Sequence, residues 1–363
     1  MSGEAARERY FTALITRLMG PLAPYYDRPG VTEIMINGPD EIYVEGPDDM
    51  TRLMTLEAGS DPEPARFADG AALRSLARAI LQYSGKMLSP HDLSQEARLP
   101  NKARVHIVQD PATPKGISIA IRRFPERRLT LEELTGPARA LSDEASTWLT
   151  EKVETGRNII IAGGTGTGKT TLLNALAGTV PNHERIVTIE DVSEIDLSDD
   201  HHVVSMEVQM PDAKGRGGIT IRDLFRAALR MRPDRILVGE CRGGEALDMI
   251  QAMNSGHAGS LSTVHADSPV RALSRLETLC LMADVDIPIV AVRRQLLEAV
   301  DVVVQIERVR LAMPDGETKT VRRVSEIAEI AGPEGAEDSG YRAALRTVFH
   351  RPPGAEPRPL LAR

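Results

Sequence analysis

The sequence is poor in cysteine, in aromatic residues and in basic charge. Its two cysteines, Cys241 and Cys280, are too few for a disulfide framework or a four-cysteine zinc site, and they fit a reducing cytoplasm. Aromatic residues make up 3% of the 363 residues, and the formal net charge is −8. Because nucleic-acid-binding proteins usually carry a basic surplus and stack bases on aromatic side chains, we expect no direct nucleic-acid contact, and a helicase is disfavoured.

Long hydrophobic runs are also missing. The most apolar runs, Asn158–Ala162 and Val300–Ile306, are far shorter than the ~20 residues that a transmembrane helix needs. Near the N-terminus, Glu4, Arg7 and Arg17 lie in or beside the only apolar stretch, a pattern unlike that of a signal peptide. We therefore expect any membrane association to be peripheral and made through partners.

The length predicts two domains, and the 42% hydrophobic and 26% charged residues are typical of a globular protein. The first is a smaller α+β domain, with short strands in 31–45, 103–110 and 116–124 and an amphipathic helix over 71–83. The predicted order is a helical segment at 1–29, the α+β domain at 30–125, a linker at 126–150, a second domain at 151–330 and a partly ordered tail without chemistry at 331–363.

The second domain alternates apolar strands with helices. The predicted strands are Asn158–Ala162, Arg185–Ile189, Arg235–Val238, Gly259–Val264 and Asp301–Ile306. The predicted helices begin near Lys169, Ile219, Gly244 and Pro269. Continuous apolar strands that alternate with helices indicate an α/β fold, in which a parallel sheet is covered on both faces.

The segment GGTGTGKT, Gly163–Thr170, follows one of these strands and opens a helix, which is the context that a phosphate-binding loop requires. Its glycines let backbone N–H groups turn towards a β-phosphate at the positive end of the helix. Lys169 then neutralises the β- and γ-phosphates, and the Thr170 hydroxyl is a Mg²⁺ ligand. We predict a P-loop (RecA-like) ATPase domain that binds Mg-ATP. The predicted nucleotide-binding residues are Gly163, Gly164, Thr165, Gly166, Thr167, Gly168, Lys169, Thr170 and Thr171.

Three other predicted strands end in polar side chains: Glu190 with Asp191, Glu240, and His265. Ligands of an open parallel sheet bind outside the carboxyl ends of the strands, so we expect these side chains at the edge that carries the phosphate loop. Glu240 is predicted to orient or deprotonate the attacking water, with Glu190 as the alternative. Asp191 and Glu190 would assist Thr170 at the metal. His265 either bonds to the γ-phosphate or makes a structural hydrogen bond.

One position departs from the generic P-loop pattern, in which the second motif is an apolar strand that ends in Asp. Here Gly239 stands at that position and Glu240 follows. We therefore expect Mg²⁺ to be held mainly by Thr170, phosphates and water. In the first domain, Arg104 and Arg122 have no acidic neighbour in sequence. Each is expected to meet either a carboxylate of its own domain or the γ-phosphate of a nucleotide bound by a neighbouring subunit.

The segments GGTGTGKTT, TIEDVSEI, ALRMRPDRILVGECRGGEALDMIQAMNSGHAGSLSTVHADSP and LSRLETL resemble those of the secretion ATPases of type II and type IV systems. The resemblance covers nearly all of Val31–Glu307. It is strongest to the tight-adherence pilus assembly (CpaF-like) branch, and the conjugation ATPases rank second. It places the Walker A, Asp, Walker B and His boxes on Gly163–Thr170, Glu190-Asp191, Glu240 and His265. It also marks Arg104 and Arg122 as arginines that act on a neighbouring subunit.

The resemblance implies a cytoplasmic homohexamer, peripheral to the inner membrane, that docks under a platform protein and uses ATP to drive pilus assembly or secretion. The four-cysteine metal insert of type II secretion ATPases is absent, which disfavours that branch. A conjugation ATPase is the nearest alternative. A nucleotide-gated scaffold with little turnover is the alternative from another class.

Overall fold

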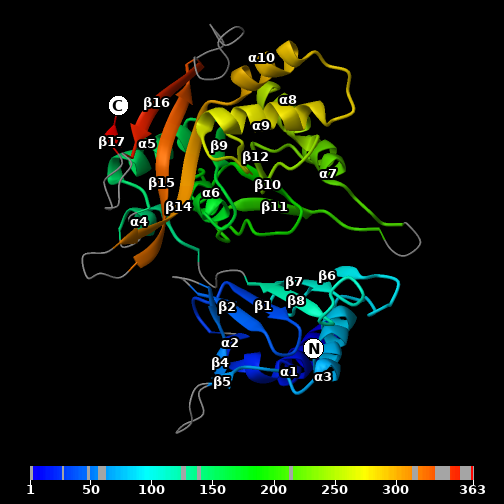
Figure 1. The fold of residues 1–363 in the computed structure, drawn as a ribbon. Helices are drawn as coiled ribbons and strands as arrows, with labels where there is room; N and C mark the ends of the chain where they lie inside the picture. Colours follow the sequence, from blue (N-terminus) through cyan, green and yellow to red (C-terminus); the bar gives the residue numbers. More distant parts are fainter. Residues whose placement is uncertain are drawn as a thin grey trace. The chain divides into compact units, whose positions relative to one another are not determined.

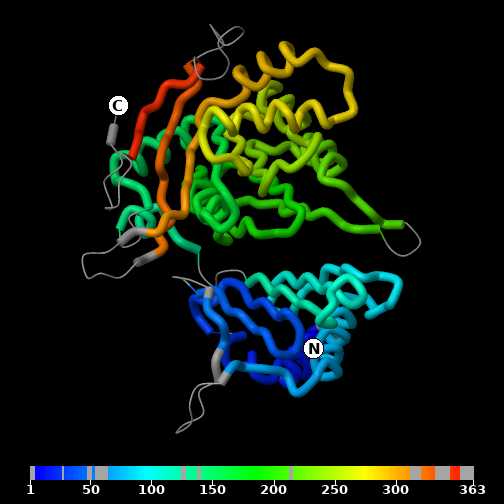
Figure 2. Tube along the Cα trace, viewed as in Figure 1, coloured from blue at the N-terminus to red at the C-terminus, as the bar shows by residue number. Residues whose placement is uncertain are grey.

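The computed structural model describes residues 3–26, 28–46, 50–55, 63–123, 128–136, 140–211, 216–312, 318–331, 344–351 and 361–362. The chain divides into two compact units, residues 1–127 and 128–363, whose courses Figures 1 and 2 trace. Both cysteines are buried free thiols, as expected of packing residues. Within the described ranges no helix has the length and apolar character needed to cross a membrane.

The first unit is a six-stranded antiparallel sheet with helices packed on one face. Its strands, in sheet order, are β3 (Met50–Arg52), β2 (Ile42–Glu45), β1 (Glu33–Asn37), β8 (Ser118–Arg122), β7 (Arg104–Val108) and β6 (Ser94–Arg98). The other elements are α1 (Gly3–Leu18), η1 (Gly20–Leu22), α2 (Ala23–Tyr26), α3 (Gly70–Tyr83) and the small pair β4 (Met54–Thr55) and β5 (Glu63–Pro64). Helix α3 begins where the Asp69 carboxylate accepts a hydrogen bond from Ala72 N, and its apolar stripe is buried against alternate strand residues.

The second unit is built on a nine-stranded mixed sheet. Its strands, in sheet order, are β11 (His202–Glu207), β10 (Arg185–Glu190), β12 (Arg235–Val238), β13 (Leu261–Val264), β9 (Ile159–Ala162), β14 (Val302–Ala312), β15 (Thr318–Ile330), β16 (Leu345–His350) and β17 (Leu361–Ala362). The first six run parallel, whereas β15 to β17 are antiparallel additions beside β14. The α/β prediction is confirmed, since the five predicted strands are parallel to one another, and β15 to β17 are antiparallel strands that were not predicted.

Helices cover both faces of this sheet because successive strand residues point to opposite sides. Ile160 packs among α7 to α10, and its neighbours Ile159 and Ile161 pack among α4 to α6. The helices are α4 (Leu131–Thr135), α5 (Asp143–Glu154), α6 (Lys169–Ala177), α7 (Ile221–Ala228), α8 (Glu245–Asn254), α9 (Pro269–Leu281) and α10 (Ile289–Ala299). Strands with both faces buried explain the continuous apolar runs of the sequence.

The unit boundary differs from the predicted linker at 126–150. Helix α4 and most of α5 lie in that range, yet Leu134, Ala145 and Leu149 are buried in the core of the second unit. The expected tail at 331–363 also contributes structure, since β16 extends the sheet and Phe349 packs edge-on against Trp148. The short segment LRTVFH of β16 stands between Gly- and Pro-rich stretches, so it is hard to recognise in the sequence. Residues 332–343, 352–360 and 363 of the expected tail lie outside the described residues.

Candidate active site

Four adjacent parallel strands deliver the predicted site residues to one edge of the sheet. The order β10-β12-β13-β9 places the ends of these strands side by side. The phosphate loop begins directly after β9, His265 directly after β13, Glu240 two residues after β12, and Glu190 ends β10. Strands of one direction end at one edge, so a ligand at the loop lies at the edge that carries both acids and the histidine.

The glycines of the loop are required by its shape. A Cβ atom at Gly163 would lie 2.6 Å from both Ile306 O and Thr167 Oγ1, so no larger residue fits there. Gly166 and Gly168 have φ angles of +69° and +96°, in the left-handed region that favours glycine. Helix α6 starts immediately after Gly168, so its unpaired backbone N–H groups and positive end face the loop.

Lys169 is held inside the loop that it is predicted to serve. Its side chain is buried, and Nζ donates a hydrogen bond of 2.9 Å to Gly164 O. The Thr167 hydroxyl donates to the same carbonyl at 2.9 Å. A buried ammonium among backbone groups at a helix N-terminus suits a polyphosphate. The bound phosphates would then supply the negative charge that neutralises Lys169.

Glu240 lies at the centre of a hydrogen-bond network. Its Oε1 is 2.9 Å from His265 Nε2, and its Oε2 accepts from Arg242 Nη2 at 2.9 Å. Bonds to Thr263 on β13 hold this turn in place: the Thr263 hydroxyl donates to Gly239 O, and Cys241 N donates to Thr263 O. The Glu240 side chain is 20% exposed, so it is both oriented and accessible to water.

The electrostatics of the site favour a neutral His265. Partial burial and then the nearby positive charge of Lys169 lower the pKa of His265, although Glu240 acts in the opposite direction. Because a carboxylate oxygen accepts and does not donate, Nε2 carries the proton of the bond to Glu240. The structural hydrogen bond foreseen for His265 is therefore present, and its partner is the predicted water-orienting acid.

Glu190 occupies a different environment. It is 2% exposed, and its Oε1 accepts hydrogen bonds of 2.9 Å from the backbone N–H groups of Glu194 and Ile195. Oε2 is buried and has no hydrogen-bond partner among the described residues. Burial raises the pKa of Glu190 to about 7, although the two backbone bonds act in the opposite direction. This carboxyl group therefore holds the loop that follows β10.

The environment of Glu190 also explains the departure at Gly239. A Cβ atom at Gly239 would lie 3.0 Å from Glu190 Cγ and 3.2 Å from Glu190 Oε1. The space that an Asp side chain would take at the end of β12 is filled by a carboxyl group from the neighbouring strand. Glycine at position 239 is thus a packing consequence of glutamate at position 190.

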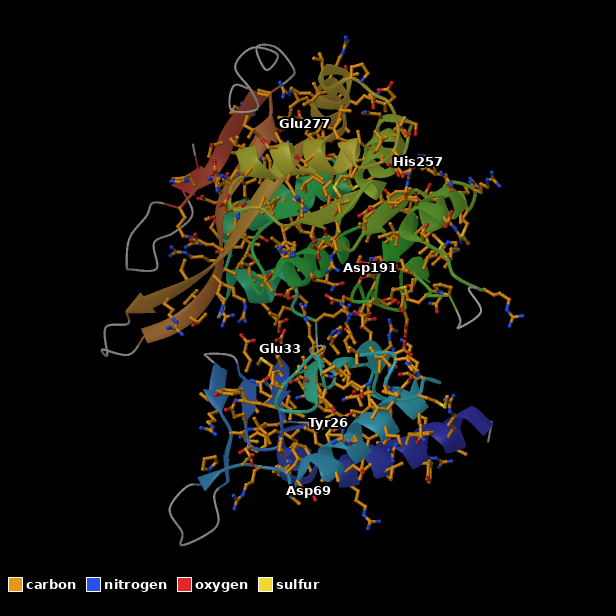
Figure 3. The ribbon with its side chains drawn as sticks, turned by 45° about the vertical axis from the view of Figure 1, so that its right-hand side comes forward. Tyr26, Glu33, Asp69, Asp191, His257 and Glu277 are labelled. Atoms are coloured by element: carbon orange, nitrogen blue, oxygen red, sulfur yellow. The ribbon has the colours of Figure 1, made fainter. Side chains whose placement is uncertain are left out.

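Arg242 connects the two acidic motifs and was not predicted as a site residue. Besides its bond to Glu240, it lies 3.4 Å from Asp191 Oδ2 through Nη1. Asp191 directly follows β10, and Figure 3 labels it there. The only sequence signal for Arg242 is its place two residues after Glu240. The expected grouping of Glu240, Asp191 and His265 is thus observed, with Arg242 as a fourth member.

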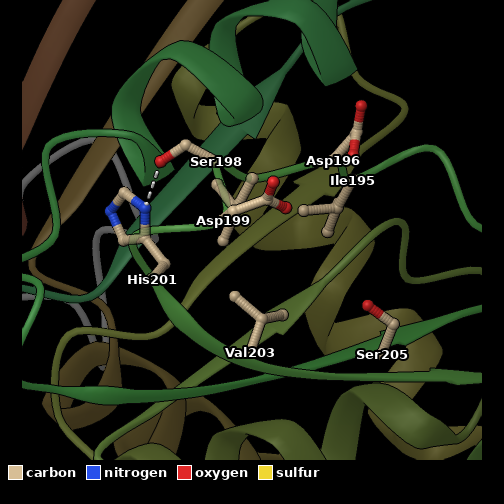
Figure 4. Close-up of a pocket in the computed structure, with 8 residues that line it drawn as sticks. Ile195, Asp196, Ser198, Asp199, His201, Val203 and Ser205 are labelled. Carbon is tan, nitrogen blue, oxygen red and sulfur yellow. Dashed lines mark hydrogen bonds between the residues drawn. The ribbon is translucent and has the colours of Figure 1, made fainter.

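A separate pocket of about 250 Å³ lies along the segment after Asp191 and the start of β11 (Figure 4). Its polar lining includes Asp199 and His201, and the ring of His201 bonds to Ser198 Oγ at 2.9 Å. None of its lining residues belongs to the phosphate loop or to the network around Glu240. It is distinct from the predicted nucleotide site.

The arginines of the first unit form a row across its sheet. Arg98, Arg104, Arg122 and Glu33 stand opposite one another on β6, β7, β8 and β1. Arg122 Nε is 3.9 Å from Glu33 Oε1, and the two side chains are 48% and 36% exposed, so this ion pair adds little stability. The carboxylate partner foreseen as one alternative is therefore present for Arg122, at long range.

Comparisons with known proteins identify the family of this chain. The protein family described as "Type II/IV secretion system protein" matches residues 18–350. The chain belongs to this family. Among its relatives is a Mycobacterium tuberculosis protein named as a candidate conjugal transfer protein, 33% identical over 338 residues that cover 91% of this chain and 88% of that protein. The type IV secretion system protein PtlH of Bordetella pertussis is 36% identical over 309 residues, covering 79% and 88% respectively.

A solved structure shares the fold. The X-ray structure of the Legionella pneumophila ATPase DotB matches 90% of this chain and 83% of its own, with a TM-score of 0.56 and 18% sequence identity. At that identity the match concerns the fold alone, an N-terminal domain followed by a RecA-like domain. The predicted family and fold are confirmed, whereas the tight-adherence branch stays a prediction.

Proposed function

We propose that this member of the type II/IV secretion family is a Mg-ATP-hydrolysing homohexameric motor that powers pilus assembly or protein secretion at the bacterial inner membrane. The observation that carries the proposal is one sheet edge on which the buried Lys169 of the phosphate loop lies beside the His265–Glu240 pair. Family membership supports the ATPase activity, and the motif segments support the tight-adherence branch.

The residues of the loop fit the phosphates of ATP. Gly163 packs without room for a side chain, two further glycines adopt left-handed conformations, and Lys169 supplies a buried positive charge. Mg²⁺, when bound, would neutralise charge on the phosphates as the γ-phosphoryl group leaves. Thr170 would be its principal protein ligand, with Asp191 nearby. The loop thus binds and orients the nucleotide, and the acids at the strand ends act on water.

The geometry favours Glu240 over Glu190 as the group that takes the proton of the attacking water. Glu240 is partly exposed and oriented by two donors, whereas Glu190 is buried and has one oxygen committed to backbone N–H groups. His265 is neutral and bonded to Glu240, so a change at the γ-phosphate near Lys169 would reach Glu240 through His265. Glu190 then keeps a supporting role at the loop and, with Asp191, on the metal side.

We further propose that Arg104 and Arg122 serve the active site of a neighbouring subunit. Three arginines stand opposite one another from Arg98 to Arg122, beside the long-range pair with Glu33, and this concentration of positive charge suits an anion such as a γ-phosphate. The partner of the hexamer would be an inner-membrane platform protein, with the ATPase on the cytoplasmic side. The names of the two relatives favour a second candidate, a transfer ATPase of a conjugative type IV system.

The test is ATP turnover by the purified full chain, alone and with its platform protein. Glu240→Gln keeps the shape and should bind ATP but lose about 10²–10⁴-fold in hydrolysis, the usual loss for a general base. Glu190→Gln is the matched control and should lose far less. Equal losses, or an unchanged rate for Glu240→Gln, would contradict the assignment. A wild-type protein that binds ATP but never turns it over would be a nucleotide-gated scaffold.

A further inference from the structure

The long hairpin of β14 and β15 lies against the phosphate loop. Strand β14 pairs with β9, which leads into the loop, and its pairing with β15 shifts register between Gln305 and Ile306. At this irregularity Ile306 O approaches Gly163, and Ile306 Cδ1 would lie 3.6 Å from a Cβ atom at Gly168. The hairpin thus forms one wall of the loop.

Arg322 of β15 makes the polar contact between this wall and the loop. Its Nε donates a hydrogen bond of 2.8 Å to Gly166 O, across 156 residues of sequence. Its Cδ packs beside Gly168, 3.6 Å from the position of a Cβ atom there. Arg308 stands opposite Arg322 on β14. Its Nη1 lies 3.4 Å from the place that a Cβ atom would occupy at Gly166. Two arginines therefore flank the tip of the loop.

We propose that Arg322 is a positioning residue of the phosphate loop, which fixes the peptide group between Gly166 and Thr167 for nucleotide binding. In a trans peptide the carbonyl and the following N–H point in opposite directions. A guanidinium that holds Gly166 O on the side of the hairpin therefore turns Thr167 N–H to the other side. Since a phosphate loop binds through such N–H groups, Arg322 preorganises the loop, and its positive charge adds to that of Lys169.

This inference rests on the proposed ATP binding and predicts a defined signature. The loop contacts the β-phosphate, which ATP and ADP share, so removal of Arg322 should weaken both nucleotides alike. It should also raise KM more than it lowers kcat, because the loop binds substrate and transition state in similar ways. A residue that only stabilised the sheet would change neither nucleotide affinity in the folded protein nor this ratio.

The experiment measures the affinities of the full chain for Mg-ATP and Mg-ADP by titration calorimetry, with the thermal midpoint recorded without nucleotide. Arg322→Met keeps the aliphatic packing on Gly168 but loses the charged donor, and we expect at least a tenfold loss for both nucleotides, the scale of one charge-assisted hydrogen bond. Arg322→Lys keeps the charge and should lose less. Arg310→Met, at an exposed position on β14, is the matched control and should bind as wild type does.

Affinities of Arg322→Met within twofold of wild type would overturn the inference, as would a loss confined to ATP. If Arg322→Met unfolds, Arg322→Lys decides, because a folded lysine variant must still bind more weakly than wild type. Failure of the wild-type chain to bind either nucleotide would instead refute the proposed function. The two failures are therefore distinguishable.

Discussion

Glu190 should make the second unit less stable as the pH rises through the range from about 4.5 to 7. Its carboxyl group is buried, and the pKa in the folded protein is about 7 against an ordinary value of 4.5. Between these values the folded chain binds more protons than the unfolded chain, so the free energy of unfolding decreases with pH. The contribution is fully present below the lower value and is lost once the pH exceeds the higher one.

The magnitude follows from that difference of about 2.5 in pKa. At about 1.4 kcal/mol for each pH unit, wild type should lose at most about 3 to 4 kcal/mol relative to a variant that cannot ionise. Glu190→Gln is that variant, since its amide keeps an oxygen for the N–H groups of Glu194 and Ile195. The difference in unfolding free energy, wild type minus variant, should therefore fall by up to this amount and become flat above about pH 7.5.

Trp148 provides the assay. It is the single tryptophan of the chain and lies on α5 in the same unit as Glu190, so its fluorescence during urea unfolding reports on that unit. The series should be run at micromolar concentration, because the sequence pI of about 5.6 falls within the window and reduces solubility there. Each pH compares wild type with Glu190→Gln, so the titration of all other groups cancels.

A stability difference that is independent of pH, or that grows in favour of wild type as the pH rises, would refute the reasoning. Glu329→Gln is a control of opposite sign. Glu329 is partly buried, yet Arg346 and Lys152 lower its pKa, so its contribution should be lost only as the pH falls below the ordinary value of 4.5. Its difference from wild type should stay flat from pH 5 to 7.5.

Three further outcomes are expected. Arg122→Ala and Lys169→Ala should each abolish most ATPase activity, and mixing the two should restore part of it if active sites are shared; mixed rings without recovery would contradict sharing. Gly239→Ala should destabilise the fold by about 1–3 kcal/mol in urea unfolding, because its methyl group crowds Glu190, and a normal stability would contradict that packing. Arg242→Gln should lower kcat with a nearly unchanged nucleotide affinity in steady-state and binding assays. A loss of affinity with unchanged kcat would contradict this role and assign Arg242 to nucleotide binding.

The elements that the sequence predicted well are strands whose two faces lie in the same environment, the protein core. Strands β9, β10 and β12 are buried on both faces, so their apolar runs are continuous and unambiguous. Strand β6 was missed because it is mostly half-exposed or exposed and has alanine as its one apolar residue, and β11 was missed because all its residues are half-exposed or exposed. Strand β15 was missed because charged residues interrupt its apolar ones, so no continuous apolar run marks it.

The candidate site shows the same division. The phosphate loop and the strand-end acids are visible in sequence because a local motif and a strand direction define them. The orientation of Glu240 towards His265, the burial of Glu190 and the contact of Arg322 with Gly166 depend on side chains from distant parts of the chain. No spacing rule connects residues 166 and 322, so only the folded structure reveals that pair.

The fit of Glu190 into the space beside Gly239 has an evolutionary consequence. A carboxylate at this sheet edge can come from the end of β10 or from the end of β12, but the space between Glu190 and Gly239 holds only one carboxylate. Substituting an acid at 239 alone would crowd two carboxylates together, and shortening 190 alone would leave a hole under the turn. We therefore expect the two positions to change together among relatives. A relative with an acidic residue at position 239 should lack one at position 190.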